Sequence, residues 1–410
     1  MRGVVITGIG VVAPTGVGVE TFWQSVLLGP SSIQKITRLE PIQYSSRIAG
    51  EVRDRSYEEL LDPRKLRTST HVAQLAVAAA ILALRDADLD TAAESPESVG
   101  VCIGTALGGW REAEQQYAIL MERGIRRVNP FIANAAPNHS IGAEVASVVD
   151  ARGAHYTPST GCPASLQAIA HGAALIADGD LDVCIAGGAE SPIIQTVLAG
   201  MGRTQELCTD NDEPEHASRP FDRRHSGLVL SEGSCILILE SCEHAVRRGV
   251  TPYARIVGSA SSCDAKGLYG FDSSGESGAR ALGKALNRSG LTAADVHYVC
   301  AHANSSPAFD RKETMVLKRA FGECAADIPV SSIKGVIGHP FGASGAFQTA
   351  ATALAIRDEL IPPTHNLETP DEGCDLHHVL GQPRPARIST AVVTGYGYGG
   401  VNAYLLLSKL

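Results

Sequence analysis

One structural unit occurs twice in this chain: an apolar strand, a glycine-rich turn and a long alanine-rich helix. The first copy carries Cys162 in its turn, and the second carries His339. Strands that alternate with helices predict an α/β fold with mainly parallel, buried strands. We therefore predict two similar halves, residues 1–250 with the cysteine and residues 251–410 with two histidines. Equivalent turns of such halves would bring Cys162, His302 and His339 into one pocket.

Composition and charge narrow the functional classes. The 410 residues are 44% hydrophobic and 19% charged, which indicates a compact globular protein. A net charge of −9 gives no general support for binding nucleic acid. The longest apolar runs fall short of the roughly 18 residues that cross a membrane. The N-terminus lacks the apolar core of a signal peptide, so we expect no membrane partner and a cytoplasmic location.

The ten cysteines are scattered through the chain. They form no C-x-x-C pair, and no histidine–cysteine cluster has the spacing of a zinc site. This pattern argues against a disulfide framework and against structural zinc. We expect neither a metal nor a diffusible cofactor.

Cys162 has a setting that most cysteines lack. Gly161 breaks the backbone before it, and Pro163 suits the first turn of the apolar helix that follows. The dipole and free N–H groups of a helix start stabilise negative charge, so we expect the thiol to ionise more readily than a free cysteine. A thiolate held in this way could carry an acyl group. The alternative is a small buried hydrophobe, as most cysteines of intracellular proteins are.

Two histidines and a glycine cluster lie in loops of the C-terminal half. His302 follows an apolar strand at 296–301, and His339 lies in a glycine-punctuated loop. Catalytic groups of α/β proteins collect in such loops, although a lone histidine is usually structural. Lys334, five residues before His339, could orient a neighbouring group. The glycines of 395–402 could bring N–H groups close to an oxyanion, or could simply form a tight turn.

The chain resembles the β-ketoacyl-acyl-carrier-protein synthases of the type II, long-chain kind, in the thiolase superfamily, over nearly its whole length. The motifs are Thr7–Gly10, Ser159–Cys162, Ala186–Glu190, Arg219–Asp222, His302, Val330–Lys334, Gly338–His339, Ile361–Thr364 and Gly397–Gly400. The resemblance implies the five-layered α-β-α-β-α thiolase fold, built from two similar halves. It also implies a homodimer, or a heterodimer with a chain-length-factor-like subunit. The substrates would be carried on the phosphopantetheine of acyl carrier protein.

The resemblance also implies a mechanism. Cys162 would take the acyl chain from its carrier, while His302 and His339 would bind the malonyl thioester carbonyl and assist loss of CO₂. Lys334 would support the histidines. The resulting enolate would attack the acyl-cysteine in a decarboxylative Claisen condensation that yields a 3-oxoacyl-acyl-carrier protein. The backbone N–H groups of Cys162 and Tyr398 would form the oxyanion hole.

The same resemblance implies roles for several further residues. Leu107 and Met201 would line the acyl pocket, and Tyr398 occupies a place where the family often has a gating phenylalanine. Asn304 and Ser306 would contact the pantetheine. Six basic residues would dock the acidic carrier protein, with ordinary solvated charge as the alternative: Arg64, Lys65, Arg67, Arg126, Arg127 and Arg203.

Three places depart from the usual pattern of the family. Ala303-Asn304 replaces Gly-Thr, His225-Ser226 replaces Arg-Asp, and Gln348 replaces a glutamate and so removes a charge near Lys334. Because the Cys–His–His set is intact, we keep condensation and favour a polyketide-type ketosynthase over a fatty-acid enzyme. The alternatives are a non-decarboxylating acyltransferase of the same fold and a weakly active partner subunit. A degradative thiolase fits less well, because it needs a second cysteine in the final loop and the last one here is Cys374.

Overall fold

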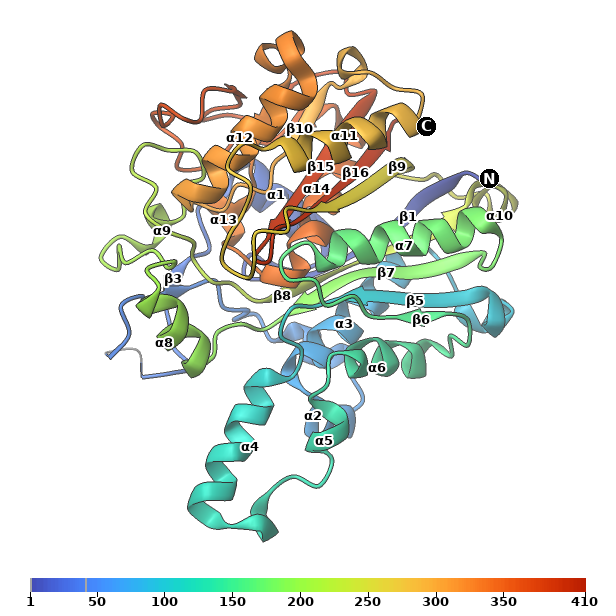
Figure 1. Ribbon diagram of the computed structural model, residues 1–410. Helices are drawn as coiled ribbons and strands as arrows, with labels where there is room; N and C mark the ends of the chain where they lie inside the picture. The colour runs from blue at the N-terminus through green and yellow to red at the C-terminus, as the bar shows by residue number, and fades with distance from the viewer. Residues whose placement is uncertain (1, 41–42) are drawn as a thin grey trace.

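A twelve-stranded mixed sheet organises the molecule (Figure 1). The computed structural model describes residues 2–40 and 43–410, apart from the side chain of Lys65. The strands of the sheet are β1 (Val4–Ala13), β2 (Gly16–Val17), β5 (Val99–Gly104), β6 (His155–Tyr156), β7 (Val183–Glu190), β8 (Gly233–Ser241), β9 (Ala254–Cys263), β10 (Tyr298–Cys300), β11 (Pro329–Ser331), β13 (His377–His378), β15 (Thr390–Gly397) and β16 (Val401–Ser408). Two small ribbons pair β3 (Gln34–Lys35) with β4 (Ile48–Ala49) and β12 (Leu360–Ile361) with β14 (Arg384–Pro385).

The sheet consists of two half-sheets that meet where β1 pairs with β9. The strand order is β13-β11-β10-β15-β16-β9-β1-β8-β7-β5-β6, and β2 pairs with β1. Only Val4 to Ile6 of β1 pair with β9, opposite Ala254 to Ile256. The two half-sheets are therefore joined at one end only, and helices can enter between them.

The prediction of mainly parallel strands is wrong for the middle of the sheet. From β7 to β15 the neighbouring strands β7, β8, β1, β9, β16 and β15 all pair antiparallel, and parallel pairs occur only in the outer parts. The sequence suggested otherwise because continuous apolar runs mark strands that are buried on both faces, whichever way they pair. The turn between β15 and β16 is too short to hold the crossover helix that a parallel pair needs.

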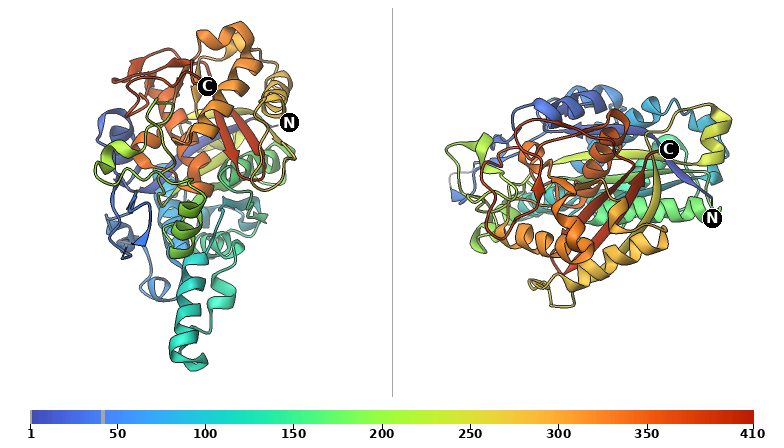
Figure 2. Two further views of the ribbon diagram at one scale, coloured as in Figure 1. Left: turned by 60° about the vertical axis from the view of Figure 1, so that its left-hand side comes forward. Right: turned by 90° about the horizontal axis from the view of Figure 1, so that it is seen from above.

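Helices and the two half-sheets form the five layers expected from the sequence (Figure 2). α3 and α6 cover the outer face of one half-sheet, α11 and α12 cover that of the other, and α7 and α14 lie between the two. None of the helices in the described part of the chain has the length and hydropathy of a membrane span. The α-helices are α1 (Val19–Leu28), α2 (Lys65–Thr68), α3 (His71–Asp86), α4 (Trp110–Arg123), α5 (Ile132–Ala135), α6 (His139–Val149), α7 (Ala164–Asp178), α8 (Gln195–Arg203), α9 (Pro214–Ala217), α10 (Cys242–Arg248), α11 (Glu276–Arg288), α12 (Pro307–Phe321), α13 (Lys334–Ile337) and α14 (Ser344–Asp358). Short 3₁₀ turns are η2 (Ser56–Leu60), η3 (Thr91–Ala93), η4 (Pro96–Ser98), η5 (Ile125–Arg127), η6 (Ala293–Asp295), η7 (Gly322–Ala326) and η8 (Phe341–Ala343).

The start of α7 is held tightly, and this fixes the position of Cys162. A side chain at Gly104 of β5 would place its Cβ 2.3 Å from the backbone of Ala164, and one at Gly345 of α14 would lie 2.6 Å from the Cβ of Leu166. Only glycine allows the strand and the two central helices to approach so closely. The helix ends at Gly179, which adopts the left-handed conformation.

A buried ion network joins Arg38, Val52 and His71 to Glu232, which directly precedes β8. This network makes the free energy of unfolding depend on pH. Glu232 accepts hydrogen bonds from Arg38 and from the N–H of Val52, and lies 3.2 Å from Nε2 of His71. Although burial alone would raise the pKa of Glu232, His71 and Arg38 lower it to about 2. A carboxyl group with a lowered pKa adds stability above its ordinary pKa, and this contribution is lost as the pH falls from about 4.5 through about 2.

We expect Glu232→Gln to lower the free energy of unfolding at pH 7 by about 3 kcal/mol, because Arg38 loses the buried anion with which it is paired. The difference from wild type should shrink steadily in denaturant titrations at pH 5, 4 and 3. The matched control is Glu276→Gln, which removes an exposed partner of Arg280 and should cost less than about 1 kcal/mol at every pH. Equal effects of the two substitutions would contradict the assignment.

Candidate active site

Four loops from distant parts of the sequence deliver the candidate site residues to one place. Cys162 precedes α7, His302 follows β10, His339 follows α13, and Tyr398 lies in the turn between β15 and β16. The backbone N–H of His339 donates to the carbonyl of Val229 at 2.8 Å, so this loop is fixed to the N-terminal part of the chain. The convergence that the repeated unit predicted is therefore present in the structure.

The thiol of Cys162 faces the imidazole of His339. Their Sγ and Nε2 atoms are 3.2 Å apart, and both side chains are buried. On the far side of the ring, Nδ1 lies 3.1 Å from the hydroxyl of Ser344. Within the described residues, the backbone N–H groups of Cys162 and Tyr398 have no acceptor. A nucleophile, an adjacent base and two free N–H donors therefore occur together.

Burial opposes the lowered thiol pKa that the position of Cys162 before a helix suggested. It raises the pKa of the thiol to about 12, which outweighs the lowering by the charge of Lys334. Burial is also the main reason that the pKa values of His302 and His339 lie well below the usual range, with the charge of Lys334 second. The expectation of a preformed thiolate is therefore wrong. The resting pair is a neutral thiol beside a neutral imidazole.

The side chain of His302 is buried but has no hydrogen-bond partner. Only 1% of the residue is exposed, and neither ring nitrogen has a partner in the described part of the chain. Its ring lies edge-on to that of His339, with 5.2 Å between centroids. Buried polar groups are almost always paired, so an unpaired imidazole indicates a place for a ligand that accepts a hydrogen bond. The main chain of His302 is held firmly, since its N–H donates to Thr394 and Glu313.

Lys334 lies behind His302 and contacts its main chain. The ammonium group donates to the carbonyl oxygen of His302 and to Oε1 of Gln348. Burial lowers the pKa of Lys334 to about 8. The residue thus supports the loop of His302 and not its ring, and its catalytic importance stays a prediction.

The role of Leu107 and Met201 in lining an acyl pocket stays a prediction, although both lie among apolar residues. Both pack against an apolar cluster that includes Cys162. The other large members of this cluster are Ile36, Ile193, Ile194, Val197, Leu198, Leu207, Leu228, Leu230 and Phe341. The carboxyl group of Glu190 holds this wall in place, because it accepts the N–H groups of Leu107 and Gly342. Burial raises the pKa of Glu190 to about 7. An apolar wall of this kind suits an acyl chain.

Tyr398 closes one side of the site. Its hydroxyl donates to Glu206 at 2.6 Å, and its ring meets that of Phe309 edge-on at 5.3 Å. Sequence reasoning did not include Glu206, because an isolated acidic residue after a short helix carries no signal of its own.

The remaining predicted residues lie away from the thiol. Asn304 and Ser306 are buried at the start of α12, where Oδ1 of Asn304 accepts the N–H of Ser306 at 3.1 Å. The described basic residues are exposed on separate segments, and their side chains form no ion pair with other described residues. They are Arg64 and Arg67 beside α2, Arg126 and Arg127 in η5, and Arg203 at the end of α8. The side chain of Lys65 lies outside the described part of the structure. All these roles stay predictions.

Glu313 is the main site residue that sequence reasoning missed. Its carboxylate accepts the N–H groups of His302 and Ala303 and the hydroxyl of Thr394. Burial raises its pKa to about 7. A signal was present in the sequence, because Glu313 interrupts the apolar stripe of α12 between Phe309 and Leu317.

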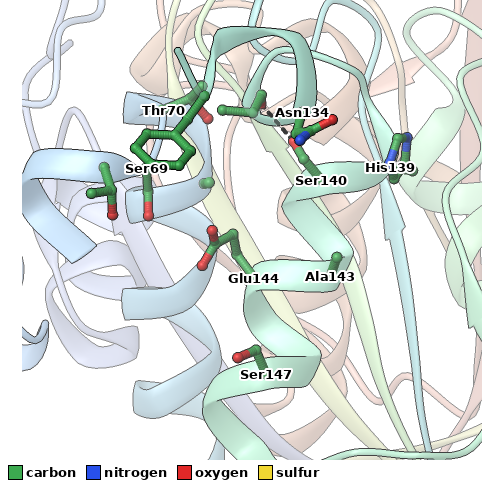
Figure 3. A pocket seen from close by; sticks show the side chains of 12 residues that line it. Ser69, Thr70, Asn134, His139, Ser140, Ala143, Glu144 and Ser147 are labelled. Carbon is green, nitrogen blue, oxygen red and sulfur yellow. Dashed lines mark hydrogen bonds between the residues drawn. The ribbon is translucent and has the colours of Figure 1, made fainter. Parts of the chain in front are cut away.

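A separate cavity of about 480 Å³ lies between the start of α3, α5 and α6 (Figure 3). Thr70, Asn134, His139 and Glu144 are among its lining residues. The hydroxyl of Thr70 is buried without a partner among the described residues. None of the predicted site residues lines this cavity, so it is distinct from the Cys162 site.

Comparison with known proteins identifies the family to which the chain belongs. The model of the β-ketoacyl synthase N-terminal domain matches residues 1–245, and that of the C-terminal domain matches residues 253–368. The chain belongs to the β-ketoacyl synthase family. One relative, the tetracenomycin polyketide synthase ketoacyl synthase alpha subunit of Streptomyces glaucescens, is 40% identical over 99% of this chain and 97% of its own length. The 3-oxoacyl-[acyl-carrier-protein] synthase 2 of Coxiella burnetii is 38% identical over 100% of this chain and 99% of its own length.

Solved ketosynthases have the same fold. A type II polyketide synthase ketosynthase, in complex with its acyl-carrier protein and bound to a hexaketide, superposes with a TM-score of 0.91 at 30% identity, covering 100% of both chains. The ishigamide ketosynthase/chain length factor superposes with a TM-score of 0.93 at 27% identity, covering 100% of this chain and 99% of that one. The predicted family, thiolase fold and class of condensing acyltransferase are confirmed. The division at residue 250 and the individual residue roles stay predictions.

Proposed function

We propose that this β-ketoacyl synthase elongates an acyl chain held on Cys162 by decarboxylative Claisen condensation with malonyl-acyl-carrier protein. The product is a 3-oxoacyl-acyl-carrier protein, in polyketide or fatty-acid biosynthesis. The observation that carries this proposal is the buried contact between Cys162 and His339, with the unpaired ring of His302 beside it. The relatives are a polyketide ketosynthase and a fatty-acid synthase enzyme, and both names fit this reaction.

The first step is acyl loading. As the sulfur of Cys162 attacks the thioester carbonyl, its proton passes to Nε2 of His339. The bond to the pantetheine sulfur breaks, and that sulfur takes the proton and leaves with the carrier. The developing oxyanion accepts the N–H groups of Cys162 and Tyr398. His339 is neutral again when the acyl-enzyme is complete.

The second step is condensation. The malonyl thioester carbonyl accepts hydrogen bonds from His302 and His339, whose low pKa values keep the rings neutral. For this step the single proton of His339 moves from Nδ1 to Nε2, and Nδ1 then accepts a hydrogen bond from the hydroxyl of Ser344. The bond to the carboxylate breaks, CO₂ leaves, and its electron pair forms an enolate that the two donors stabilise. The enolate carbon attacks the acyl carbonyl, and the sulfur of Cys162 leaves as a thiolate that takes up one proton from solvent, so each cycle consumes one proton. Both imidazoles are buried, which strengthens their hydrogen bonds to the enolate.

The test is mass spectrometry of the intact protein, mixed first with acyl-carrier protein and then with malonyl-carrier protein. The proposal expects an acyl adduct, then its discharge as a product two carbons longer with release of CO₂. An adduct that transfers without loss of CO₂ would instead mean a non-decarboxylating acyltransferase. An adduct that is never elongated would mean a partner subunit that needs a second chain.

The proposal extends to partners and compartment. An acyl-carrier protein and a chain length factor accompany ketosynthases in the two solved relatives, which supports the same partners here. We propose a homodimer, or a heterodimer with a chain-length-factor-like subunit. Substrates would arrive on phosphopantetheine, with no other cofactor. The free state of all ten cysteines supports the cytoplasm, where thiols stay reduced.

Docking of the carrier gives a direct prediction. Arg126 and Arg127 lie in η5, on the segment that projects from the body beyond α4 (Figure 2). Charge reversal of both should raise the KM for the carrier substrate about tenfold and leave kcat unchanged, because rim charges act on encounter with an acidic partner. Reversal of Lys284 and Arg319, which are exposed on α11 and α12, is the control and should change neither constant. An unchanged KM in the first variant would contradict docking at this segment.

A further inference from the structure

Gln348 has surroundings that only an amide satisfies. The residue lies in α14 and is 1% exposed. Its Nε2 donates to the carbonyl oxygens of Cys300 at 3.2 Å and Thr394 at 3.1 Å, and its Oε1 accepts from the ammonium of Lys334 at 3.1 Å. Carbonyl oxygens can only accept and an ammonium can only donate, so the orientation of the amide is fixed. A carboxylate here would place an oxygen against two carbonyl oxygens.

The neutral amide leaves Lys334 without an anion at short range. The ammonium donates to two uncharged oxygens, the carbonyl of His302 and Oε1 of Gln348. No carboxylate of the described residues lies within 4.0 Å of Lys334. Glu313 acts on it from farther away, but three other donors occupy that carboxylate. A buried cation with neutral contacts exerts its full charge on its neighbours, since little solvent screens it.

The charge of Lys334 acts on side chains that take part in the proposed condensation. The titratable side chains that face Lys334 are Cys162 before α7, Cys300 and His302 at the end of β10, Asp310 and Glu313 on α12, and His339 after α13. The positive charge lowers the pKa values of both histidines and that of Cys162. It therefore favours neutral imidazoles and a more acidic thiol, the two states that the proposed function needs.

We propose that Gln348 is a positioning residue that holds Lys334 against the main chain of His302 while leaving its charge uncompensated. The amide thereby lets a single lysine act on the thiol and on both imidazoles. This inference deepens the proposed function and rests on it only for its consequence in turnover. The state of the thiol itself can be measured without any condensation.

The test is the rate at which iodoacetamide alkylates Cys162 between pH 6 and 7.5, where Lys334 carries its charge, with peptide mass spectrometry to separate that adduct from others. Gln348→Glu places an anion beside Lys334, so alkylation should become about tenfold slower across this range, as expected if the thiol pKa rises by about one unit. Lys334→Met removes the charge and should have an effect in the same direction. The matched control is Thr349→Val, the next residue of α14, whose buried hydroxyl donates to the carbonyl of Gly345 in the same helix and whose profile should match wild type.

Each outcome decides the proposal. If the Gln348→Glu profile superimposes on that of wild type, Gln348 is a packing residue and the proposal fails. It also fails if Lys334→Met leaves the alkylation rate unchanged, and this variant gives the answer if Gln348→Glu does not fold. Shifted profiles in a protein that never elongates an acyl chain would support the role of Gln348 and overturn the proposed function alone.

Discussion

Replacement of Cys162 by alanine should abolish acyl loading and lower condensation on the order of 10⁴-fold or more. The intact protein should gain no mass from acyl-carrier protein, whereas wild type gains the acyl group. The reason is chemical, because the sulfur is the atom that forms the thioester, and the other nearby groups are imidazoles and backbone N–H donors. The expected loss is therefore larger than for any residue that only orients or stabilises.

The matched control is Cys235→Ala. Cys235 is also a buried thiol, but it lies on β8 and faces the carbonyl of Ala346 in the core. It should load at the wild-type rate and lose only stability, by about 1 kcal/mol for a small cavity. An acyl adduct of equal yield on Cys162→Ala would show that another residue carries the chain.

His302→Ala should separate the two half-reactions. Acyl loading should proceed near the wild-type rate, because His339 is the imidazole that contacts the thiol. Condensation should fall about 10²- to 10³-fold, the usual loss when one donor to a developing oxyanion is removed. His302→Asn keeps an N–H donor and should recover part of this loss. Rapid-quench measurement of adduct formation and of CO₂ release gives the two rates separately.

The same substitution has an unusual expected effect on stability. Truncation of a buried ring costs packing, but the ring of His302 also holds two nitrogens without partners. Removal of unpaired buried polar atoms offsets part of the packing loss. We therefore expect His302→Ala to lower Tm less than His378→Ala, since His378 has a hydrogen bond to the carbonyl of Cys374. Slowed loading, or a larger fall in Tm than in the control, would contradict this account.

The residue pattern predicted an α/β fold and the members of the reacting set, and the resemblance to the β-ketoacyl synthases predicted the five layers. Cys162, His302 and His339 stood out because glycine and proline mark the loops after buried strands, and the repeated unit implied that these loops meet. Strand direction could not be read in the same way, because β1 and β8 are as apolar as the parallel strands β5 and β7. Periodicity reports burial, and burial is equal in both cases.

The electrostatics of the site depended on contacts that no local pattern encodes. The helix after Cys162 predicted an acidic thiol, but the loss of water around that thiol is decided by the apolar residues packed around it, which come from distant parts of the sequence. Glu313 and Gln348 have polar side chains in helices that read as ordinary amphipathic or alanine-rich segments. Gln348 donates to main-chain carbonyls of β10 and β15, and Glu313 accepts from N–H groups of the loop after β10. These groups come close only in the folded chain.

The shared central layer has a consequence for how this chain can be divided. α7 and α14 contact each other at Leu166 and Gly345, and one continuous core contains residues of both helices and of both half-sheets. A polypeptide that stops near residue 250 would leave one side of α7 in water, and the complementary piece would expose α14 in the same way. We therefore expect neither piece to fold by itself. Residues 1–250 and 251–410 should each precipitate when expressed alone and become soluble only when expressed together. The central core can therefore form only after the whole chain has been synthesised.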